Sequence, residues 1–367
     1  MKIVTVIGAR PQIIKAAALS RAIRQHFSKE MQEVIVHTGQ HYDNNMSQVF
    51  FDELDIPQPQ YNIGVGSDSH GVQTAKMIEG IEKILLKEKP DCIVLYGDTN
   101  STLAGAISAS KIHVPIVHIE AGLRSFNKSM PEEINRICCD HCSTMLFSPT
   151  ATGYKNLVNE GITSGIYHCG DVMYDNSKYF ANIADKKSQI LEKEQLRGID
   201  YILCTIHRDN NTDQPERLNA IFKALLKISE SKMVVLPLHP RTSKLLSINL
   251  EQTLFNTITN NANIKLLPPA SFFDMIVLER HAQMVVTDSG GVQKEAFFFQ
   301  KPCLILRSET EWKEIVECGA AAITDANEDK IIESYNSFVE NPPHNYPKIF
   351  GDGKAAEFIC KEMLENF

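Results

Sequence analysis

Short apolar runs alternate with helical patterns along the whole chain, and this alternation restricts the possible folds more than any other feature. The β-branched run at residues 3–7 ends in a glycine turn, and a helical pattern over residues 13–23 follows at once. Such a run, turn and helix form the first half of a βαβ unit, which builds a parallel sheet. The alternation starts afresh at residues 201–205, and 367 residues are too many for one ordinary core. The sequence therefore predicts an α/β protein with two domains of similar build.

A charged stretch over residues 185–198 separates the two series of runs. We place the crossing between the domains just after Gly170, which gives a first domain at residues 1–170 and a second at residues 171–350. Residues 351–367 follow, with a Gly-Asp-Gly turn before an amphipathic helical pattern.

The composition is that of an ordinary globular protein and argues against several functional classes. The chain is 43% hydrophobic and 22% charged, and its net charge of −8 disfavours a broad nucleic-acid-binding surface. No apolar run approaches the ~18 residues that a membrane helix needs. The start, MKIVTVIGARPQ, lacks the features of a signal peptide, and the nine unevenly spaced cysteines are typical of reduced thiols. We therefore expect a cytoplasmic protein with no nucleic-acid and no membrane partner.

The stretch TDSGGVQKEAFFF, residues 287–299, joins an apolar run to a helical pattern and resembles a phosphate cradle. Gly290 and Gly291 allow the backbone to approach a ligand closely, and Ser289 is suited to cap the helix. Free N–H groups and the helix dipole favour an anion there. Glu295, about one turn further on, is placed to bind a ribose hydroxyl pair. The alternative is a plain strand–helix turn without a ligand.

Three carboxylates in the first half are candidates for acid–base chemistry. Asp98 and Glu120 directly follow the apolar runs at residues 92–96 and 115–119, and Glu132 lies in the first turn of a predicted helix. Carboxylates that share one crevice titrate apart and serve as acid and base. The alternative for Glu132 is that it only complements the helix dipole.

Basic and polar side chains also follow the apolar runs. Arg10 and Lys15 lie near the first glycine turn, where they can reach a bound anion, and Arg124 and Arg136 are candidates to orient the carboxylates. Other run ends carry Gln40, His41, His207, Arg208, His239, Arg241 and Arg307. Because the carboxyl ends of parallel strands bind ligands, we expect a diphosphate at the second domain and a reacting polar group at the first. A purely structural role stays open for each histidine.

The cysteine-rich segment at residues 138–142 contains a C-x-x-C spacing but has no second cysteine pair at zinc-finger distance. Small thiols pack well on a helix. We therefore predict no metal site.

Ten motifs follow one another along the chain at the ends of these runs. They read GARPQIIKAA, VHTGQHYD, YGDTNSTLAGA, VHIEAGLRS, MPEEINR, TIHR, LPLHPRT, TDSGGVQKEA, RSETEW and FGDG. Together they resemble the non-hydrolysing UDP-N-acetylglucosamine 2-epimerases. The resemblance implies glycosyltransferase-B type architecture, with two Rossmann-like domains, a central cleft and a C-terminal helix at residues 351–367 that packs back on the N-terminal domain. It also implies a homodimer, no cofactor, and a UDP-sugar and UDP as the bound molecules.

The resemblance further implies inversion at sugar carbon 2, by loss and return of UDP, for bacterial surface polysaccharide precursors. The implied catalytic residues are Asp98, Glu120, Glu132 and His207. The implied UDP-binding residues are Arg10, Lys15, Ser289, Gly290, Gly291, Glu295 and His239. The implied residues around the sugar are Gln40, His41, Arg124, Arg136, Arg208 and Glu311.

The chain departs from the commonest form of that family. Gln12 stands where that form has Glu, and residues 310–314 read TEWKE in place of TERPE. These positions are more similar to a subgroup that includes UDP-2,3-diacetamido-glucuronate 2-epimerases, so this second sugar stays open as the alternative substrate. A UDP-sugar-dependent glycosyltransferase, a hydrolysing epimerase and a non-catalytic nucleotide-sugar sensor are the alternatives of other kinds.

Overall fold

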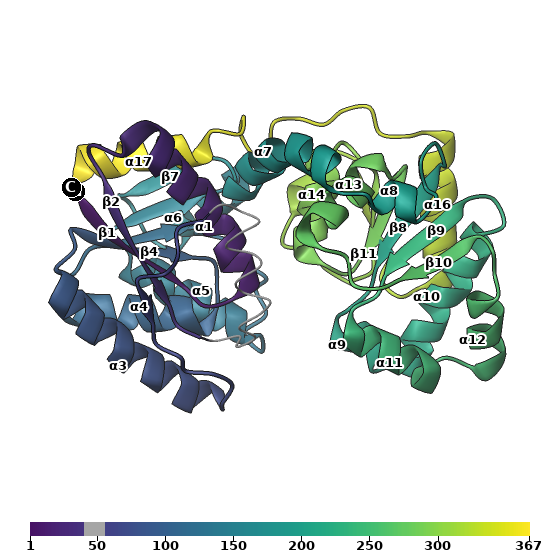
Figure 1. The fold of residues 1–367 in the computed structure, drawn as a ribbon, viewed down its shortest axis with the longest axis horizontal. Helices are drawn as coiled ribbons and strands as arrows, with labels where there is room; N and C mark the ends of the chain where they lie inside the picture. Colours follow the sequence, from purple (N-terminus) through teal and green to yellow (C-terminus); the bar gives the residue numbers. More distant parts are fainter. Residues whose placement is uncertain (40–55) are drawn as a thin grey trace. The chain divides into compact units, whose positions relative to one another are not determined.

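The chain divides into two compact units, each built around one parallel β-sheet (Figure 1). The computed structural model describes residues 1–39 and 56–367. The first unit comprises Met1–Asn176 and Lys348–Phe367, and the second comprises Ser177–Pro347. The prediction of an α/β fold with two parallel-sheet domains is confirmed.

The first unit alternates strands and helices in the order predicted for βαβ units. Its elements are β1 (Lys2–Ile7), α1 (Arg10–Ala22), a π-helical turn (Ile23–Phe27), β2 (Gln32–His37), β3 (Tyr61–Asn62), α3 (His70–Glu88), β4 (Cys92–Tyr96), α4 (Asn100–Lys111), β5 (Ile116–Ile119), α5 (Pro131–Cys142), β6 (Met145–Ser148), α6 (Ala151–Asn159), β7 (Ile166–His168) and α17 (Ala355–Asn366). Helix α7 (Val172–Lys187) carries the chain into the second unit.

The second unit repeats this alternation. Its elements are α8 (Ile190–Lys193), β8 (Tyr201–Thr205), α9 (Asp209–Thr212), α10 (Pro215–Ile228), β9 (Met233–Pro237), α11 (Pro240–Asn249), α12 (Gln252–Thr259), β10 (Ile264–Leu267), α13 (Phe272–His281), β11 (Met284–Thr287), α14 (Gly290–Phe298), β12 (Cys303–Ile305), α15 (Lys313–Glu317), β13 (Ala321–Ile323) and α16 (Glu328–Glu340).

The two sheets share one strand order. Within the described residues, the first sheet runs β3-β2-β1-β4-β5-β6-β7 and the second runs β10-β9-β8-β11-β12-β13, with every pairing parallel. In both, the order reverses once, between β1 and β4 and between β8 and β11. Ligands of doubly wound sheets bind outside the carboxyl ends of the strands at this reversal. The topology therefore points to the turns after these four strands.

Each sheet is held by an apolar core that follows from the sequence periodicity. In the second unit, α10 buries a stripe at helical spacing against β8 and β9: Leu218, Ile221, Phe222 and Leu225. In the first unit, Met77, Ile81 and Leu85 form the corresponding buried stripe of α3. Because the helices and strands bury their apolar side chains in these cores, polar side chains gather in the turns at the strand ends.

Candidate active site

The turns after β1 and β4 of the first unit are joined by one buried amide. The Gln12 side-chain oxygen accepts from the N–H of Gly8 at 2.9 Å and of Ala9 at 3.2 Å. Its nitrogen donates to the Tyr96 carbonyl and to the Thr102 hydroxyl, each at 3.0 Å. All four hydrogen-bonding positions of the amide are thus used within the protein. Gln12 therefore holds the two turns together and has nothing left for a ligand.

Asp98 follows β4 and is held by α5. Its carboxylate pairs with the guanidinium of Arg136, and its backbone carbonyl accepts from the Asn135 amide at 2.9 Å. The Asp98 side chain keeps 30% of its exposure, so it stays open to a substrate. Arg136 also pairs with buried Glu133 at 2.9 Å. Arg136 thus pairs with two carboxylates, those of Asp98 and Glu133.

Glu120 follows β5 in a backbone conformation that is rare for a residue with a side chain. Its φ is +72°, a region whose cost is on the order of 1–3 kcal/mol, and the N–H groups of Glu120 and Ala121 both bond to the Phe147 carbonyl at 3.0 Å. The Glu120 carboxylate contacts the ammonium of Lys15. A Cβ on Gly97 would lie 3.0 Å from that ammonium and 3.1 Å from the carboxylate, so the β4 turn packs directly on this pair.

The remaining candidates of the first unit fall into separate environments. Glu132 is exposed in the first turn of α5. Arg10 is exposed at the first residue of α1. Arg124, in contrast, is 4% exposed, and Asp140 and Glu160 both pair with its guanidinium. Arg124 thus belongs to a buried ion-pair network. The candidates at positions 40 and 41 lie outside the described residues.

In the second unit, a buried carboxylate organises the turn after β8. Asp288, which follows β11 and is fully buried, accepts from the N–H groups of His207 and Arg208 at 3.1 Å and from the Asn211 amide at 3.2 Å. The His207 Nδ1 lies 3.1 Å from the same carboxylate. Although burial raises the pKa of Asp288, His207 and these donors bring it below its usual value. Asp288 therefore fixes the orientation of the half-exposed His207 ring, with Nε2 as the outer nitrogen.

The glycines of the cradle are not needed by the fold. A Cβ on Gly290 would come no closer than 3.7 Å to any described neighbour, and one on Gly291 no closer than 3.8 Å. Neither glycine has the positive φ that a side chain disfavours. Ser289 caps α14, since its hydroxyl accepts from the Val292 N–H at 3.4 Å. What glycine provides here is a backbone without a Cβ at a helix N-terminus, so that an anion can approach the N–H groups closely.

One wall of the cradle is charged and aromatic. Arg307 pairs with Glu311 through two bonds of 2.9 and 3.0 Å, and the Trp312 indole donates to the Gly290 carbonyl at 3.0 Å. The Lys294 ammonium lies 4.3 Å from the centre of the Trp312 ring. Burial acts to raise the pKa of Glu311, but Arg307 and Arg208 bring it below its usual value, so the carboxylate is ionised.

Glu295 has an acidic neighbour that the sequence did not reveal. Glu279 of α13 is 1% exposed, and no described N–H or O–H group bonds to its carboxyl oxygens. Burial first, and then Glu295, raises the pKa of Glu279 well above its usual range. The raised pKa favours the protonated, neutral form of Glu279 beside Glu295. His239 is the exposed cap of α11, and its Nδ1 accepts from the Arg241 N–H at 3.3 Å.

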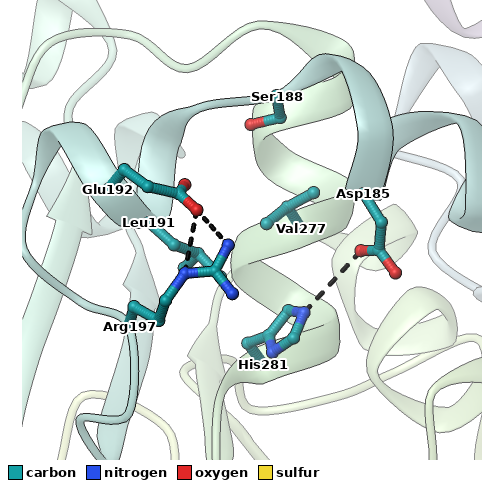
Figure 2. A pocket seen from close by; sticks show the side chains of 7 residues that line it. All are labelled: Asp185, Ser188, Leu191, Glu192, Arg197, Val277 and His281. Carbon is teal, nitrogen blue, oxygen red and sulfur yellow. Dashed lines mark hydrogen bonds and ion pairs between the residues drawn. The ribbon is translucent and has the colours of Figure 1, made fainter.

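The second unit also has a separate small cavity that contains none of the predicted site residues (Figure 2). It encloses about 180 Å³, and its polar lining is paired, with Glu192 on Arg197 and with His281 3.7 Å from Asp185. Within residues 1–39 and 56–367, no group of three or more His, Cys, Asp or Glu side chains is arranged to hold a metal ion. Over the same residues, no helix is both long enough and apolar enough to cross a membrane.

The family model described as UDP-N-acetylglucosamine 2-epimerase matches residues 22–364. The chain belongs to this family. A Methanococcus maripaludis protein named as a homolog of UDP-N-acetylglucosamine 2-epimerase is 49% identical over all of both chains. The UDP-2,3-diacetamido-2,3-dideoxy-D-glucuronate 2-epimerase of Pseudomonas aeruginosa is 46% identical, also over all of both chains. The predicted family and the predicted class of enzyme, a UDP-sugar 2-epimerase, are confirmed.

Solved structures of such epimerases share the fold over the full chain. The Methanocaldococcus jannaschii UDP-GlcNAc 2-epimerase, in complex with UDP-GlcNAc and UDP, matches with a TM-score of 0.88 at 40% identity, and all of both chains is covered. The Neisseria meningitidis enzyme bound to UDP-GlcNAc matches with a TM-score of 0.88 at 28% identity, again over all of both chains.

Proposed function

We propose that this epimerase inverts carbon 2 of a UDP-linked N-acetylhexosamine by expelling UDP and adding it back. The proton on carbon 2 is not acidic, because no carbonyl adjoins that carbon. Loss of this proton together with the bond from carbon 1 to the phosphate oxygen gives a 2-acetamidoglucal and UDP. Return of a proton to the opposite face of carbon 2, with attack of the phosphate oxygen on carbon 1, gives the epimer. The reaction needs acid–base groups and a firm hold on UDP, but no redox cofactor.

The second unit supplies the hold on UDP. In this proposal the diphosphate binds at the N-terminus of α14, next to Ser289, Gly290 and Gly291, and Glu295 accepts from the ribose hydroxyls. The observation that carries the proposal is that the fold itself requires glycine at neither position 290 nor 291. The N–H groups and basic side chains around the turn stabilise the charge that develops on the leaving UDP. His207, held by Asp288, is suited to face the same phosphates.

The first unit supplies the acid–base chemistry. Asp98 and Glu120 each pair with a cation, Arg136 and Lys15 respectively, while Glu132 is exposed. Removal of a proton from one face of carbon 2 and its return to the other face need more than one acid–base group, and these carboxylates are the candidates for both steps. Lys15, which the sequence assigned to the UDP site, serves in this proposal to hold the Glu120 carboxylate in place.

We propose UDP-N-acetylglucosamine as the substrate, with UDP-2,3-diacetamido-glucuronate as the second candidate. The second is favoured by a relative of that name at 46% identity, close to the 49% of the relative named for the first sugar. We further propose, from the family resemblance, a cytoplasmic homodimer that supplies precursors for bacterial surface polysaccharides.

Incubation with each of the two UDP-sugars in deuterated water tests the proposal. The expected product is the 2-epimer with deuterium at carbon 2, formed from one sugar much faster than from the other. Asp98→Asn and Glu120→Gln should lose turnover but retain UDP binding. Epimerisation without solvent exchange would contradict the mechanism, and UDP release only with an added acceptor would indicate a glycosyltransferase.

A further inference from the structure

The first unit contains a buried charged cluster that the proposed chemistry does not use. His118 lies in β5 and Asp140 in α5, and the side chains of both have no exposed surface. The His118 Nδ1 lies 2.6 Å from one carboxylate oxygen of Asp140. Arg124 lies 2.7 Å from the other oxygen of the same carboxylate. Burial of a charged pair away from solvent costs free energy unless the pair is well hydrogen-bonded. The position of this pair in the fold therefore calls for an explanation.

The bonds of this pair lead to both turns that carry candidate acid–base residues. The His118 Nε2 lies 2.8 Å from the carbonyl of Gly97, the residue directly before Asp98. Asp140 accepts from the N–H of Gly122, two residues after Glu120, at 3.1 Å. The pair thus bridges the turn after β4 and the turn after β5.

The surroundings of His118 determine its charge. A backbone carbonyl only accepts hydrogen bonds, so the Nε2 facing Gly97 carries a proton. Asp140 accepts from Gly122 and pairs with Arg124, so it is ionised, and the Nδ1 of His118 carries a proton as well. Although burial alone lowers the pKa of His118, Cys139 and Asp140 raise it well above the usual value. For Asp140 the directions are reversed. Burial alone raises its pKa, but His118 and Arg124 bring it below the usual value.

Helix α5 adds three more contacts to the same framework. Glu133 accepts from the N–H groups of Ser125 and Phe126 at 2.9 Å, and Arg136 holds Asp98. Residues 133, 136 and 140 recur at spacings of three and four, so they share one face of the helix. One helix face therefore contacts both turns at several points.

We infer that His118 and Asp140 are positioning residues of the reaction: a permanently charged His118, held by Asp140, fixes Asp98 relative to Glu120. The inference rests on the proposed function, because it assigns the two turns their catalytic carboxylates. The charged or titratable groups that face the pair are Arg124, Cys139 and, through Arg124, Glu160. A neutral imidazole would lose either the bond to Gly97 or the bond to Asp140.

The charge of His118 is tested on the unmutated protein. With ¹⁵N-labelled histidine, the His118 ring should show protons on both nitrogens at every pH from 6 to 9, while an exposed histidine loses one proton near pH ~6.5. His118→Gln assigns the resonance. A neutral His118 ring at pH 8 would overturn the inference.

The positioning role is tested by kinetics. His118→Gln, and separately Asp140→Asn, should lower kcat about 100-fold, the scale of a misplacement near 1 Å, and leave the affinity for UDP within about twofold. His168→Gln is the matched control, since His168 is an exposed histidine in β7 of the same sheet. A kcat equal to that of the control in both folded variants would sink the inference. Failure of the unmutated protein to exchange deuterium at carbon 2 would instead refute the proposed function and leave the charge of His118 as measured.

Discussion

The cap of the last helix should make the stability of the first unit depend on pH. Asp175 of α7 is 6% exposed, and its carboxylate accepts from the N–H groups of Ala355 at 3.2 Å and Ala356 at 2.8 Å, the first residues of α17. Burial raises the pKa of Asp175 from 3.8 to about 6, against the effect of these two bonds. Nearby Asp171 adds to the rise and Arg21 opposes it.

The direction of this pH dependence follows from whether the folded or the unfolded state holds the proton on Asp175. Between pH 3.8 and about 6, the folded state keeps a proton on Asp175 that the unfolded chain has lost. The stabilising contribution of Asp175 to the free energy of unfolding is therefore fully present below pH 3.8 and is lost as pH rises through about 6. At ~1.4 kcal/mol per pH unit, the difference of about two units amounts to about 3 kcal/mol, of which about 2 kcal/mol appears between pH 4.5 and 7.5.

Asp175→Asn replaces the titrating carboxyl group with an amide that does not titrate, so it isolates the contribution of this proton to stability. We expect the free energy of unfolding of the unmutated protein, minus that of the variant, to be about 2 kcal/mol larger at pH 4.5 than at pH 7.5. Urea unfolding followed by circular dichroism measures it. The single tryptophan, Trp312, lies in the second unit, so its fluorescence transition is an internal control that should not change. A difference that is constant with pH, or larger at pH 7.5, would refute the reasoning.

Three further substitutions separate binding, packing and orientation. Gly290→Ala should lower UDP affinity in calorimetry by about tenfold or more while unfolding changes by less than about 1 kcal/mol, because the fold leaves room for the Cβ; unchanged affinity would argue against the cradle. Gly122→Ala should destabilise the first unit by about 3 kcal/mol or more in urea unfolding, since φ is +80° and the Cβ would lie 2.2 Å from the Gly153 carbonyl oxygen; an unchanged midpoint contradicts this. Asp288→Asn should lower kcat about 10- to 100-fold, because the His207 ring loses the carboxylate that orients it; an unchanged kcat would remove Asp288 from this role.

The sequence predicted the sheets and the turns that carry the polar residues, because both depend on local patterns. An apolar run followed by glycine and a helix identifies its own strand end, so Asp98 and Ser289 could be placed without knowledge of the fold. The side chains that pair with the site residues could not be predicted in this way. Arg136 reaches Asp98 across 38 residues, and Asp288 reaches His207 across 81.

Long-range pairing also gives residues of the predicted site protein contacts that the sequence did not reveal. The sequence predicts that Lys15 lies beside an anion of the ligand, and the structure adds its contact with Glu120, which lies 105 residues away in sequence. The sequence predicts that Arg124 lies near the sugar, and the structure adds that its buried guanidinium pairs with Asp140 and Glu160. The raised pKa of Glu279 depends on burial that no local pattern reveals.

The interrupted path of the first unit has a consequence for how the protein is made. The chain leaves this unit after Asn176 and returns at Lys348, and only then adds α17, which packs on α1. At ~5–20 residues per second, residues 177–347 take roughly 10–30 s to synthesise. Throughout that time the surface that Ile359, Cys360 and Met363 will cover is without its helix. The first unit can therefore complete its fold only after the whole of the second unit has been synthesised.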